Sequence, residues 1–340
     1  MIYVRADGNG KIGMGHIMRC IAISREVVEM GEEVTFILAG EEAREIVEAA
    51  GFRVQVLGTD YALMEAEWPA LEQVLPWGAT VLVDSYYVTE DYLQRLETRG
   101  TVVYMDDQNV FPYPVTGIVN GNFYGDVMEY HVPIVMGGSL YAPLRREYSK
   151  TRDTGHPEYV MITTGGSDPY SITLKVLREL EKRDYLKDLP IRVVCGRFNQ
   201  DFEIIKEMEQ YYPKLKVLQN VPDMWNLMKD ARVAITAAGT TLSELSCMGV
   251  PAICFSFADN QEYLTRYCRE KNYVYFADSY LQHGDALIPR ICDALEELSE
   301  NPQLLEGYRH KAMALVDGRG SSRIAEVLIR LMQENVTNRR

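Results

Sequence analysis

Several features are scarce or absent in this 340-residue sequence, and each absence narrows the possible functions. The six cysteines stand singly without a CxxC pair, and the five histidines form no HExxH motif or His/Cys cluster, so we expect neither a disulfide framework nor a bound metal. No apolar run approaches the roughly 20 residues of a membrane-spanning helix. The N-terminal segment lacks the apolar core and cleavage site of a signal peptide. We therefore expect a cytoplasmic protein without a membrane span.

Basic residues are also in short supply. Lys and Arg total 35 against 49 Asp and Glu, which gives a net charge of −14. Binding to nucleic acid or to an anionic membrane surface needs a basic face that attracts phosphate, so both partners are disfavoured. A local basic pocket for a small phosphate-containing ligand is still compatible with this balance.

The composition is otherwise that of a globular protein, with 47% apolar and 25% charged residues. Short apolar runs rich in β-branched residues alternate with amphipathic stretches of helical spacing over residues 1–106, and the alternation resumes over residues 159–271. Strands of this near-continuous apolar character belong to parallel sheets that helices cover on both faces. The sequence therefore predicts an α/β protein with two similar halves.

The stretch between the two halves has a different character. Residues 109–152 contain several prolines and glycines, and the polar segment 150–157 is typical of a linker. The length fits about two domains at roughly 150 residues each. We predict a Rossmann-like domain at residues 1–150, a second one at 151–320 and a C-terminal helix at 321–340, with the two parallel sheets facing an interdomain cleft.

The loops that follow predicted strands are the places to look for a site, because parallel sheets bind ligands at the carboxyl ends of their strands. In the first such loop, Gly8, Gly10 and Gly13 satisfy the GxGxxG pattern of dinucleotide-binding folds. That pattern also requires an acidic residue at the end of the second strand. Glu32 and Glu33 stand at its start instead, which argues against a nicotinamide cofactor.

The end of the same loop offers a different chemistry. Gly13 and Gly15 permit a close backbone approach, and His16 opens the predicted helix. The positive end of the helix dipole disfavours the imidazolium form, so His16 is a candidate general base. Arg19 follows three residues later on the same helical face and can hold an anion. The alternative is a histidine that caps its own helix, with Arg19 in solvent.

Acidic residues end two further strands of the first half. Asp84 is followed closely by Tyr86, and Asp106 is followed by Asp107. A carboxylate with an aromatic hydroxyl suits a sugar or could orient His16, and paired carboxylates can share a proton or grip hydroxyl groups. For Asp84, capping of the following helix is the alternative.

Glycines and hydroxyl residues mark the strand-to-helix turns of the second half. Gly165 and Gly166 expose backbone amides in the first turn, which makes a plausible phosphate cradle. In a later turn, Gly239, Thr240 and Thr241 form an anion site at a helix N-terminus, where we expect a diphosphate.

Two further positions extend this predicted nucleotide site. Glu244 lies about one turn inside the helix and can accept both hydrogen bonds of a ribose diol, although simple complementarity to the helix N-terminus is the alternative. Asn260 and Gln261 follow another strand, and their amides can bind sugar hydroxyls or phosphate without adding charge. As an alternative, Asp259 or Asn260 caps the next helix.

Taken together, these motifs resemble the PseG family, hydrolases of the pseudaminic acid pathway that remove UDP from UDP-2,4-diacetamido-2,4,6-trideoxy-β-L-altropyranose. That family is similar in turn to the MurG-like glycosyltransferases of GT-B fold, and the spore-coat polysaccharide proteins called SpsG share the pattern. The resemblance spans most of residues 1–275. It is carried by Asp7 with Gly13-x-Gly15-His16-x-x-Arg19-Cys20, by Val83–Tyr86, Gly138–Tyr148, Gly165–Asp168, Ala238–Glu244 and Asp259–Gln261.

The resemblance implies a GT-B fold and a metal-independent, inverting hydrolysis without a cofactor, in which water attacks the anomeric carbon. His16 matches the catalytic histidine of the family, and Asn220–Met224 falls where uracil is held, largely through backbone. Together with the positions singled out above, the predicted substrate-binding residues are Asp7, Gly13, Gly15, Arg19, Asp84, Tyr86, Asn260 and Gln261. The predicted nucleotide-binding residues are Gly165, Gly166, Val221, Met224, Gly239, Thr240, Thr241 and Glu244.

The leading hypothesis is thus hydrolysis of a UDP-activated 2,4-diacetamido-2,4,6-trideoxy sugar by a monomer or weak dimer. The closest alternative is a GT-B glycosyltransferase that uses a sugar or lipid acceptor in place of water, and release of UDP without an acceptor separates these two. A nucleotide-sugar-binding subunit with no chemistry of its own belongs to a different class, and it predicts indifference to His16→Ala. A nicotinamide dehydrogenase is the fourth possibility, which absence of cofactor binding would dismiss.

Overall fold

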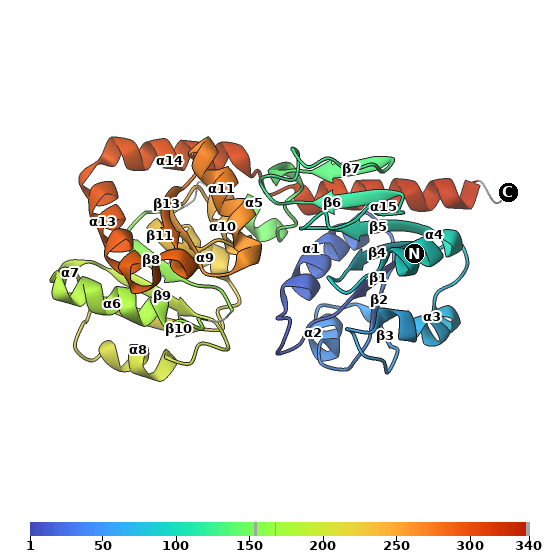
Figure 1. Ribbon diagram of the computed structural model, residues 1–340, viewed down its shortest axis with the longest axis horizontal. Helices are drawn as coiled ribbons and strands as arrows, with labels where there is room; N and C mark the ends of the chain where they lie inside the picture. The colour runs from blue at the N-terminus through green and yellow to red at the C-terminus, as the bar shows by residue number, and fades with distance from the viewer. Residues whose placement is uncertain (153–154, 167, 338–340) are drawn as a thin grey trace. The chain divides into compact units, whose positions relative to one another are not determined.

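The computed structural model describes residues 1–152, 155–166 and 168–337, apart from the side chains of Asn260 and Val336. The chain forms two compact units (Figure 1). Unit 1 contains Met1–Arg146 and the chain from Gly318 on, whereas unit 2 contains Glu147–Asp317. The first crossing between the units therefore lies close to the predicted linker. The predicted C-terminal helix is part of unit 1 and not a separate segment.

Unit 1 is built on seven strands in the order β3-β2-β1-β4-β5-β6-β7, and every neighbouring pair is parallel. The last two strands extend the sheet through the stretch rich in Pro and Gly, where the sequence predicts only short regular structure, and each spans four residues. The strands are β1 (Ile2–Ala6), β2 (Val34–Leu38), β3 (Arg53–Val56), β4 (Thr80–Asp84), β5 (Thr101–Met105), β6 (Gly117–Asn120) and β7 (Ile134–Gly137).

Helices cover both faces of this sheet, as the apolar character of its strands predicts. Alternate side chains of a strand enter opposite cores, so that Phe36 packs in one apolar cluster and Ile37 in the other. The helices of unit 1 are α1 (Gly15–Glu29), α2 (Arg44–Ala49), η1 (Met64–Glu67), α3 (Trp68–Val74), α4 (Glu90–Arg99), η2 (Ser139–Tyr141) and α15 (Gly320–Thr337), while α5 (Arg146–Thr151) begins at the crossing.

Helix α15 completes the core of unit 1 from the far end of the sequence. Ile324, Ala325, Leu328 and Leu331 recur at helical spacing, and all four are buried in the cluster that contains α1 and strands β1 and β2. Near its other end, the Asn335 amide donates to the Thr80 hydroxyl at 3.1 Å and accepts from the Thr101 hydroxyl at 2.9 Å. The last helix therefore packs against the first sheet and belongs to the core of unit 1.

Unit 2 contains a six-stranded parallel sheet in the order β10-β9-β8-β11-β12-β13. Its edge strand β13 was not predicted from the sequence, because the segment YFADS mixes polar and apolar residues without a clear period. The strands are β8 (Tyr159–Thr163), β9 (Ile191–Cys195), β10 (Leu215–Gln219), β11 (Ala231–Ala237), β12 (Ala252–Ser256) and β13 (Tyr275–Ser279).

The helices of unit 2 are shorter on average, and several occupy a single turn. One apolar cluster joins β8, β9 and β11 to α6, α8 and α13, and it contains Val160, Leu177 and Ile291 at 0–2% exposure. The helices are α6 (Ile172–Lys182), α7 (Tyr185–Asp188), α8 (Phe202–Met208), α9 (Met224–Met228), α10 (Thr240–Cys247), η3 (Asp259–Gln261), α11 (Glu262–Lys271), α12 (Tyr280–His283), η4 (Gly284–Ala286), α13 (Leu287–Glu300) and α14 (Pro302–Leu315).

Both sheets have the same connectivity, and this places their binding edges. In each sheet the chain runs outward from a central strand to one side, then returns and continues on the other side. The strand order reverses between β1 and β4 in unit 1 and between β8 and β11 in unit 2. Ligands of such sheets bind at the carboxyl ends of the strands at this switch point.

Candidate active site

The switch point of unit 1 brings together residues that are far apart in the sequence. His16 lies in the first turn of α1, directly after the β1 loop, and Asp84 is the last residue of β4. Because β1 and β4 are paired in parallel, both residues lie at the same edge of the sheet. The topology therefore brings Asp84 to the edge of the sheet where His16 lies.

His16 and Asp84 form a buried hydrogen-bonded pair. The His16 Nδ1 atom lies 2.7 Å from Asp84 Oδ1, and the two side chains are 10% and 0% exposed. Since an ionised carboxylate only accepts hydrogen bonds, we assign the Nδ1–H as donor, which leaves Nε2 with a lone pair. An acidic partner at Nδ1 fixes the tautomer and stabilises the imidazolium that forms when Nε2 takes a proton.

Arg19 binds two carboxylates of its own chain. Its Nε and one terminal nitrogen contact the two Asp84 oxygens, each at 2.6 Å, and the other terminal nitrogen lies 2.9 Å from Asp107 Oδ2. Burial alone would raise the pKa of Asp84, but Arg19 and then His16 outweigh it and hold that pKa well below its ordinary value. Asp84 is thus a permanent anion, and the anion that Arg19 was predicted to hold is internal.

Asp107 joins this network from the loop that follows the neighbouring strand β5. Its Oδ2 accepts the Tyr86 hydroxyl at 2.6 Å, and its Oδ1 accepts the Asn122 amide at 2.9 Å. The Tyr86 ring packs edge-on against the imidazole of His16, with centroids 4.7 Å apart. Burial and the adjacent Asp107 raise the pKa of Tyr86, so its hydroxyl stays a hydrogen-bond donor.

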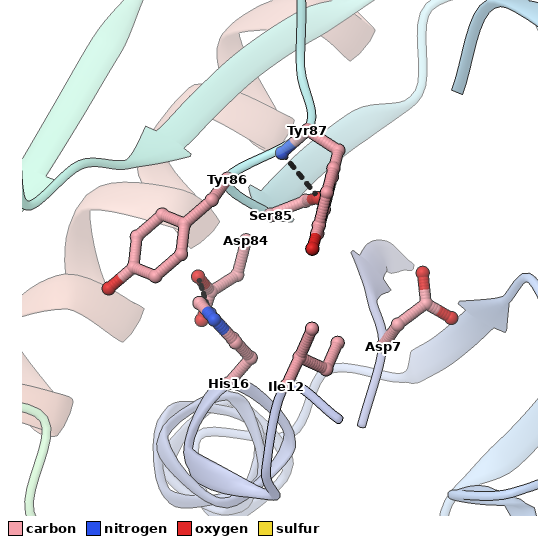
Figure 2. A pocket seen from close by; sticks show the side chains of 7 residues that line it. All are labelled: Asp7, Ile12, His16, Asp84, Ser85, Tyr86 and Tyr87. Carbon is pink, nitrogen blue, oxygen red and sulfur yellow. Dashed lines mark hydrogen bonds and ion pairs between the residues drawn. The ribbon is translucent and has the colours of Figure 1, made fainter. Parts of the chain in front are cut away.

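A pocket of about 100 Å³ opens in front of this pair (Figure 2). His16 and Tyr86 line one part of it, and the loops after β1 and β4 supply the rest. Figure 2 shows the Tyr86 ring beside the imidazole and the Asp7 carboxylate turned away from both. The lining residues are Asp7, Ile12, His16, Asp84, Ser85, Tyr86 and Tyr87.

Asp7 lines the pocket, but its carboxylate has other partners. One oxygen accepts the Ala39 backbone N–H at 2.7 Å, and the other is bonded to the buried guanidinium of Arg5. Arg5 also makes two hydrogen bonds with Glu67, at 2.8 Å and 2.6 Å. We therefore revise the predicted substrate contact of Asp7: the residue fixes the β1 loop against the end of β2 and so shapes the pocket.

The two glycines before His16 have separate tasks. Gly13 has a φ of +77°, and its backbone pairs in both directions with Asn9, which closes a tight turn. Gly15 begins α1, and a side chain there would meet open space, so the absence of a Cβ leaves room beside His16. No side chain of the described residues caps the N-terminus of α1, whose first amides remain available to a ligand.

The switch point of unit 2 is formed by backbone and hydroxyl groups. Gly165 follows β8 with a φ of +88°, and Gly239 precedes α10. Side chains at Gly165, Gly166 or Gly239 would meet open space. Among the described residues no side chain caps α10, and Thr240 at its start is exposed, so this helix presents unpaired N–H groups. This backbone arrangement is compatible with the predicted phosphate site.

The remaining predicted site residues lie on different elements of unit 2 and differ in burial. Val221 lies in the loop between β10 and α9, Met224 begins α9, and both are half-buried. Glu244 is half-buried on α10, and Thr241 is half-buried at its first turn. The Gln261 side chain accepts the Phe257 N–H at 2.9 Å, so it organises the loop after β12. The side chain of Asn260 and the whole of Ser167 lie outside the described residues.

Sequence reasoning missed several parts of the network because their partners are remote in the chain. Asp107 was only a general candidate, and Asn122 was not considered, since the short strand β6 that precedes it was not predicted. Asp106 does not reach the pocket. It accepts hydrogen bonds from the hydroxyls of Tyr113 at 2.7 Å and Tyr130 at 2.5 Å, and from two backbone amides.

The described part of the chain offers neither a metal-binding cluster nor a helix that could span a membrane. No group of three or more His, Cys, Asp or Glu side chains there is arranged to hold a metal ion. Within the same residues, no helix combines the length and the apolarity that crossing a membrane requires.

Comparison with known proteins finds a family model that matches unit 2 and relatives that match most of the chain. Residues 160–314 match the model of the glycosyltransferase family 28 C-terminal domain. The chain is 23% identical over 350 residues to the spore coat polysaccharide biosynthesis protein SpsG of Bacillus subtilis, and the match covers 97% of this chain and 98% of that protein. It is 26% identical over 275 residues to an uncharacterized protein of Methanocaldococcus jannaschii, of which it spans about half, 74% of this chain matching 54% of that one.

The solved structures identify the fold. The MurG of Acinetobacter baumannii superposes with a TM-score of 0.64 at 14% sequence identity, covering 97% of this chain and 99% of that one. The two parallel-sheet domains therefore have the GT-B fold, which confirms the predicted fold class.

Proposed function

We propose that this protein is a glycosyltransferase that takes its sugar from a UDP-sugar and uses His16 as the general base. The observation that carries the proposal is the buried Asp84–His16 pair, whose Nε2 nitrogen is left for proton transfer at the edge of a pocket. The match of unit 2 to a glycosyltransferase family supports transfer, and the motifs that resemble PseG and MurG-like proteins support UDP as the carrier.

The proposed reaction assigns a separate task to each switch point. At unit 1, His16 Nε2 removes the proton from an acceptor hydroxyl while that oxygen attacks the anomeric carbon. The bond from this carbon to the diphosphate breaks with inversion, and Asp84 stabilises the imidazolium. At unit 2, the N–H groups of α10 with Thr240 and Thr241 stabilise the charge on the departing UDP. The acceptor proton ends on His16 Nε2, and the electron pair of the broken bond leaves with UDP.

Hydrolysis is a second candidate, in which water replaces the acceptor hydroxyl. The pocket lined by His16 is compatible with it, because about 100 Å³ is enough room for several water molecules. The segment from Gly13 to Cys20 also resembles hydrolases of UDP-2,4-diacetamido sugars. The same base serves both reactions, so the residues of unit 1 alone do not choose between them.

The deciding experiment follows the fate of the sugar by NMR. Purified protein is incubated with UDP-N-acetylglucosamine and with UDP-diacetamido-trideoxy sugars, each with and without candidate sugar or lipid acceptors. We expect UDP to appear only when an acceptor is present, with inverted configuration in the product. Free sugar and UDP without an acceptor would establish hydrolysis instead. Binding of UDP with the donor recovered intact under every condition would contradict both reactions and support a binding subunit.

A further inference from the structure

The His16–Asp84 pair does not stand alone, because a second carboxylate lies behind it. Arg19 is placed between Asp84 and Asp107 and donates to both. Its side chain is 11% exposed, and those of Asp84 and Asp107 are 0% and 18% exposed. One guanidinium therefore balances only one of two nearly buried carboxylates, and a single negative charge is left over in the cluster.

This leftover charge matters for a residue that must accept a proton. With His16 neutral the cluster is an anion, and with His16 protonated it is neutral. Without Asp107, Arg19 would already cancel Asp84, and a proton on His16 would create an isolated positive charge at a mostly buried position, which is unfavourable.

We propose that Asp107 is a positioning residue that prepares His16 to accept the proton of the nucleophile. It does so by two routes. Its charge favours the imidazolium that forms at His16, and its Oδ2 atom holds the Tyr86 hydroxyl, which keeps the Tyr86 ring against the imidazole. The inference rests on the proposed role of His16 as base, and it assigns a task to a residue outside the pocket lining.

The other groups around His16 leave this task to Asp107. Cys20, from the next turn of α1, donates to Asp84 at 3.5 Å, and burial raises its thiol pKa, so it stays neutral. Tyr86 stays neutral for the reason given above. Tyr87 also lines the pocket. Asp7 shares Arg5 with Glu67, so that cluster also has two carboxylates for one guanidinium, but the Asp7 carboxylate is turned away from His16 (Figure 2). Among the described carboxylates, Asp84 and Asp107 are the two that the Arg19 guanidinium joins into one cluster with His16.

The test measures protonation of His16 directly and needs no substrate. The imidazole signals of the whole protein are titrated by NMR, with the His16 signal identified by its loss in H16Q. In Asp107→Asn we expect His16 to take up its proton at a lower pH than in the wild type, because one nearby negative charge is removed. Asp107→Glu keeps the charge and should restore most of the wild-type value.

Asn122→Ala is the matched control, because it removes a hydrogen bond to Asp107 and leaves its charge. It should titrate at His16 like the wild type. If Asp107→Asn and Asn122→Ala titrate alike, or if Asp107→Glu behaves like Asp107→Asn, the proposal is wrong. Where activity is found, the acidic limb of the pH–rate profile should shift in the same direction in Asp107→Asn. Absence of turnover with every donor would refute the proposed function, whereas the titration judges Asp107 separately.

Discussion

The two switch points occupy equivalent places in two sheets whose first six strands follow the same order, yet they differ in kind. In unit 1 the site contains an imidazole, two carboxylates and a guanidinium, most of them buried and paired. In unit 2 it consists of glycines, threonines and the open N-terminus of α10. The same topology therefore supports two chemistries, and the side chains at the strand ends decide which one.

The difference follows from what each task demands. Proton transfer requires a titratable group whose orientation and charge are fixed, and buried ion pairs provide that at a cost in desolvation. Holding a diphosphate requires N–H donors that approach it closely, and glycines provide that without added charge. We expect substitutions in the two regions to separate these functions.

The largest expected effect comes from His16→Ala, which removes the base and leaves unit 2 intact. Turnover should fall by about 10²–10⁴-fold, as loss of general-base catalysis predicts. The affinity for UDP, measured by calorimetry, should stay within about twofold, since the nucleotide is assigned to unit 2. His310→Ala, an exposed position on α14, is the control and should change neither quantity. Equal loss of turnover and UDP affinity in His16→Ala would contradict the assignment of the base to unit 1 and of the nucleotide to unit 2.

Asp84→Asn tests the charged character of unit 1 through stability. The variant leaves the buried guanidinium of Arg19 without its principal partner, so the free energy of unfolding should fall by about 3 kcal/mol. Denaturant unfolding followed by circular dichroism measures this change. Glu41→Gln, which loses an exposed ion pair with Arg44, should cost less than about 0.5 kcal/mol. If Asp84→Asn lowered the free energy of unfolding as little as Glu41→Gln does, the Asp84–Arg19 ion pair would not be important for stability.

The same carboxylate predicts a pH dependence. Asp84 has a folded-state pKa below its ordinary value of about 4, so it stabilises the fold above that pH. The stabilisation should decline as the pH falls below about 4, when the unfolded state binds the proton first. The free energy of unfolding should be measured for wild type and Asp84→Asn at several pH values between 3 and 7. The difference between the two proteins should shrink toward low pH. Parallel curves would indicate that another group dominates acid unfolding.

Gly239→Asp tests unit 2 by giving α10 a cap of its own. The aspartate would fit, because the added Cβ meets open space, and its carboxylate would accept the N–H groups assigned to the diphosphate. We expect UDP affinity to fall at least about tenfold while stability rises by about 0.5–1 kcal/mol. Gly239→Ala, which adds a side chain without a cap, should lose much less affinity. Unchanged UDP binding in Gly239→Asp would place the diphosphate elsewhere.

The smallest expected effect concerns a residue that supports the fold of unit 1 away from its site. Asn335→Ala removes two hydrogen bonds between α15 and the starts of β4 and β5, and it should cost about 1 kcal/mol of unfolding free energy. Turnover should stay within twofold. The exposed neighbour Gln333, changed to alanine, should leave both measurements as they are. A large loss of turnover in Asn335→Ala would contradict this prediction and indicate that α15 affects the active site.

Much of the fold could be predicted because its strands are buried on both sides. Continuous apolar runs such as Thr80–Asp84 match the observed strand, and the carboxyl ends of such strands led to His16, Asp84 and Gly239. Strands β6, β7 and β13 were not predicted, since four residues among glycines, or five of mixed polarity, leave little periodic signal.

The network around the base was harder to foresee. Arg19 has the spacing of a ligand-binding residue, but its partners Asp84 and Asp107 lie 65 and 88 residues further along the chain. A local pattern carries no information on such pairs. The same holds for Asp7, whose motif suggested a substrate contact and whose carboxylate is bonded to Arg5 and Ala39.

The return of α15 to the first sheet has a consequence for how the protein is made. Unit 2 is a continuous segment, so it can complete its core as soon as residue 317 has left the ribosome. Unit 1 must wait for Leu331 before its apolar cluster is filled, although most of it is synthesised first. A nascent chain that stops after unit 2 therefore leaves uncovered the apolar residues of unit 1 that pack on α15, although the core of unit 2 is already complete.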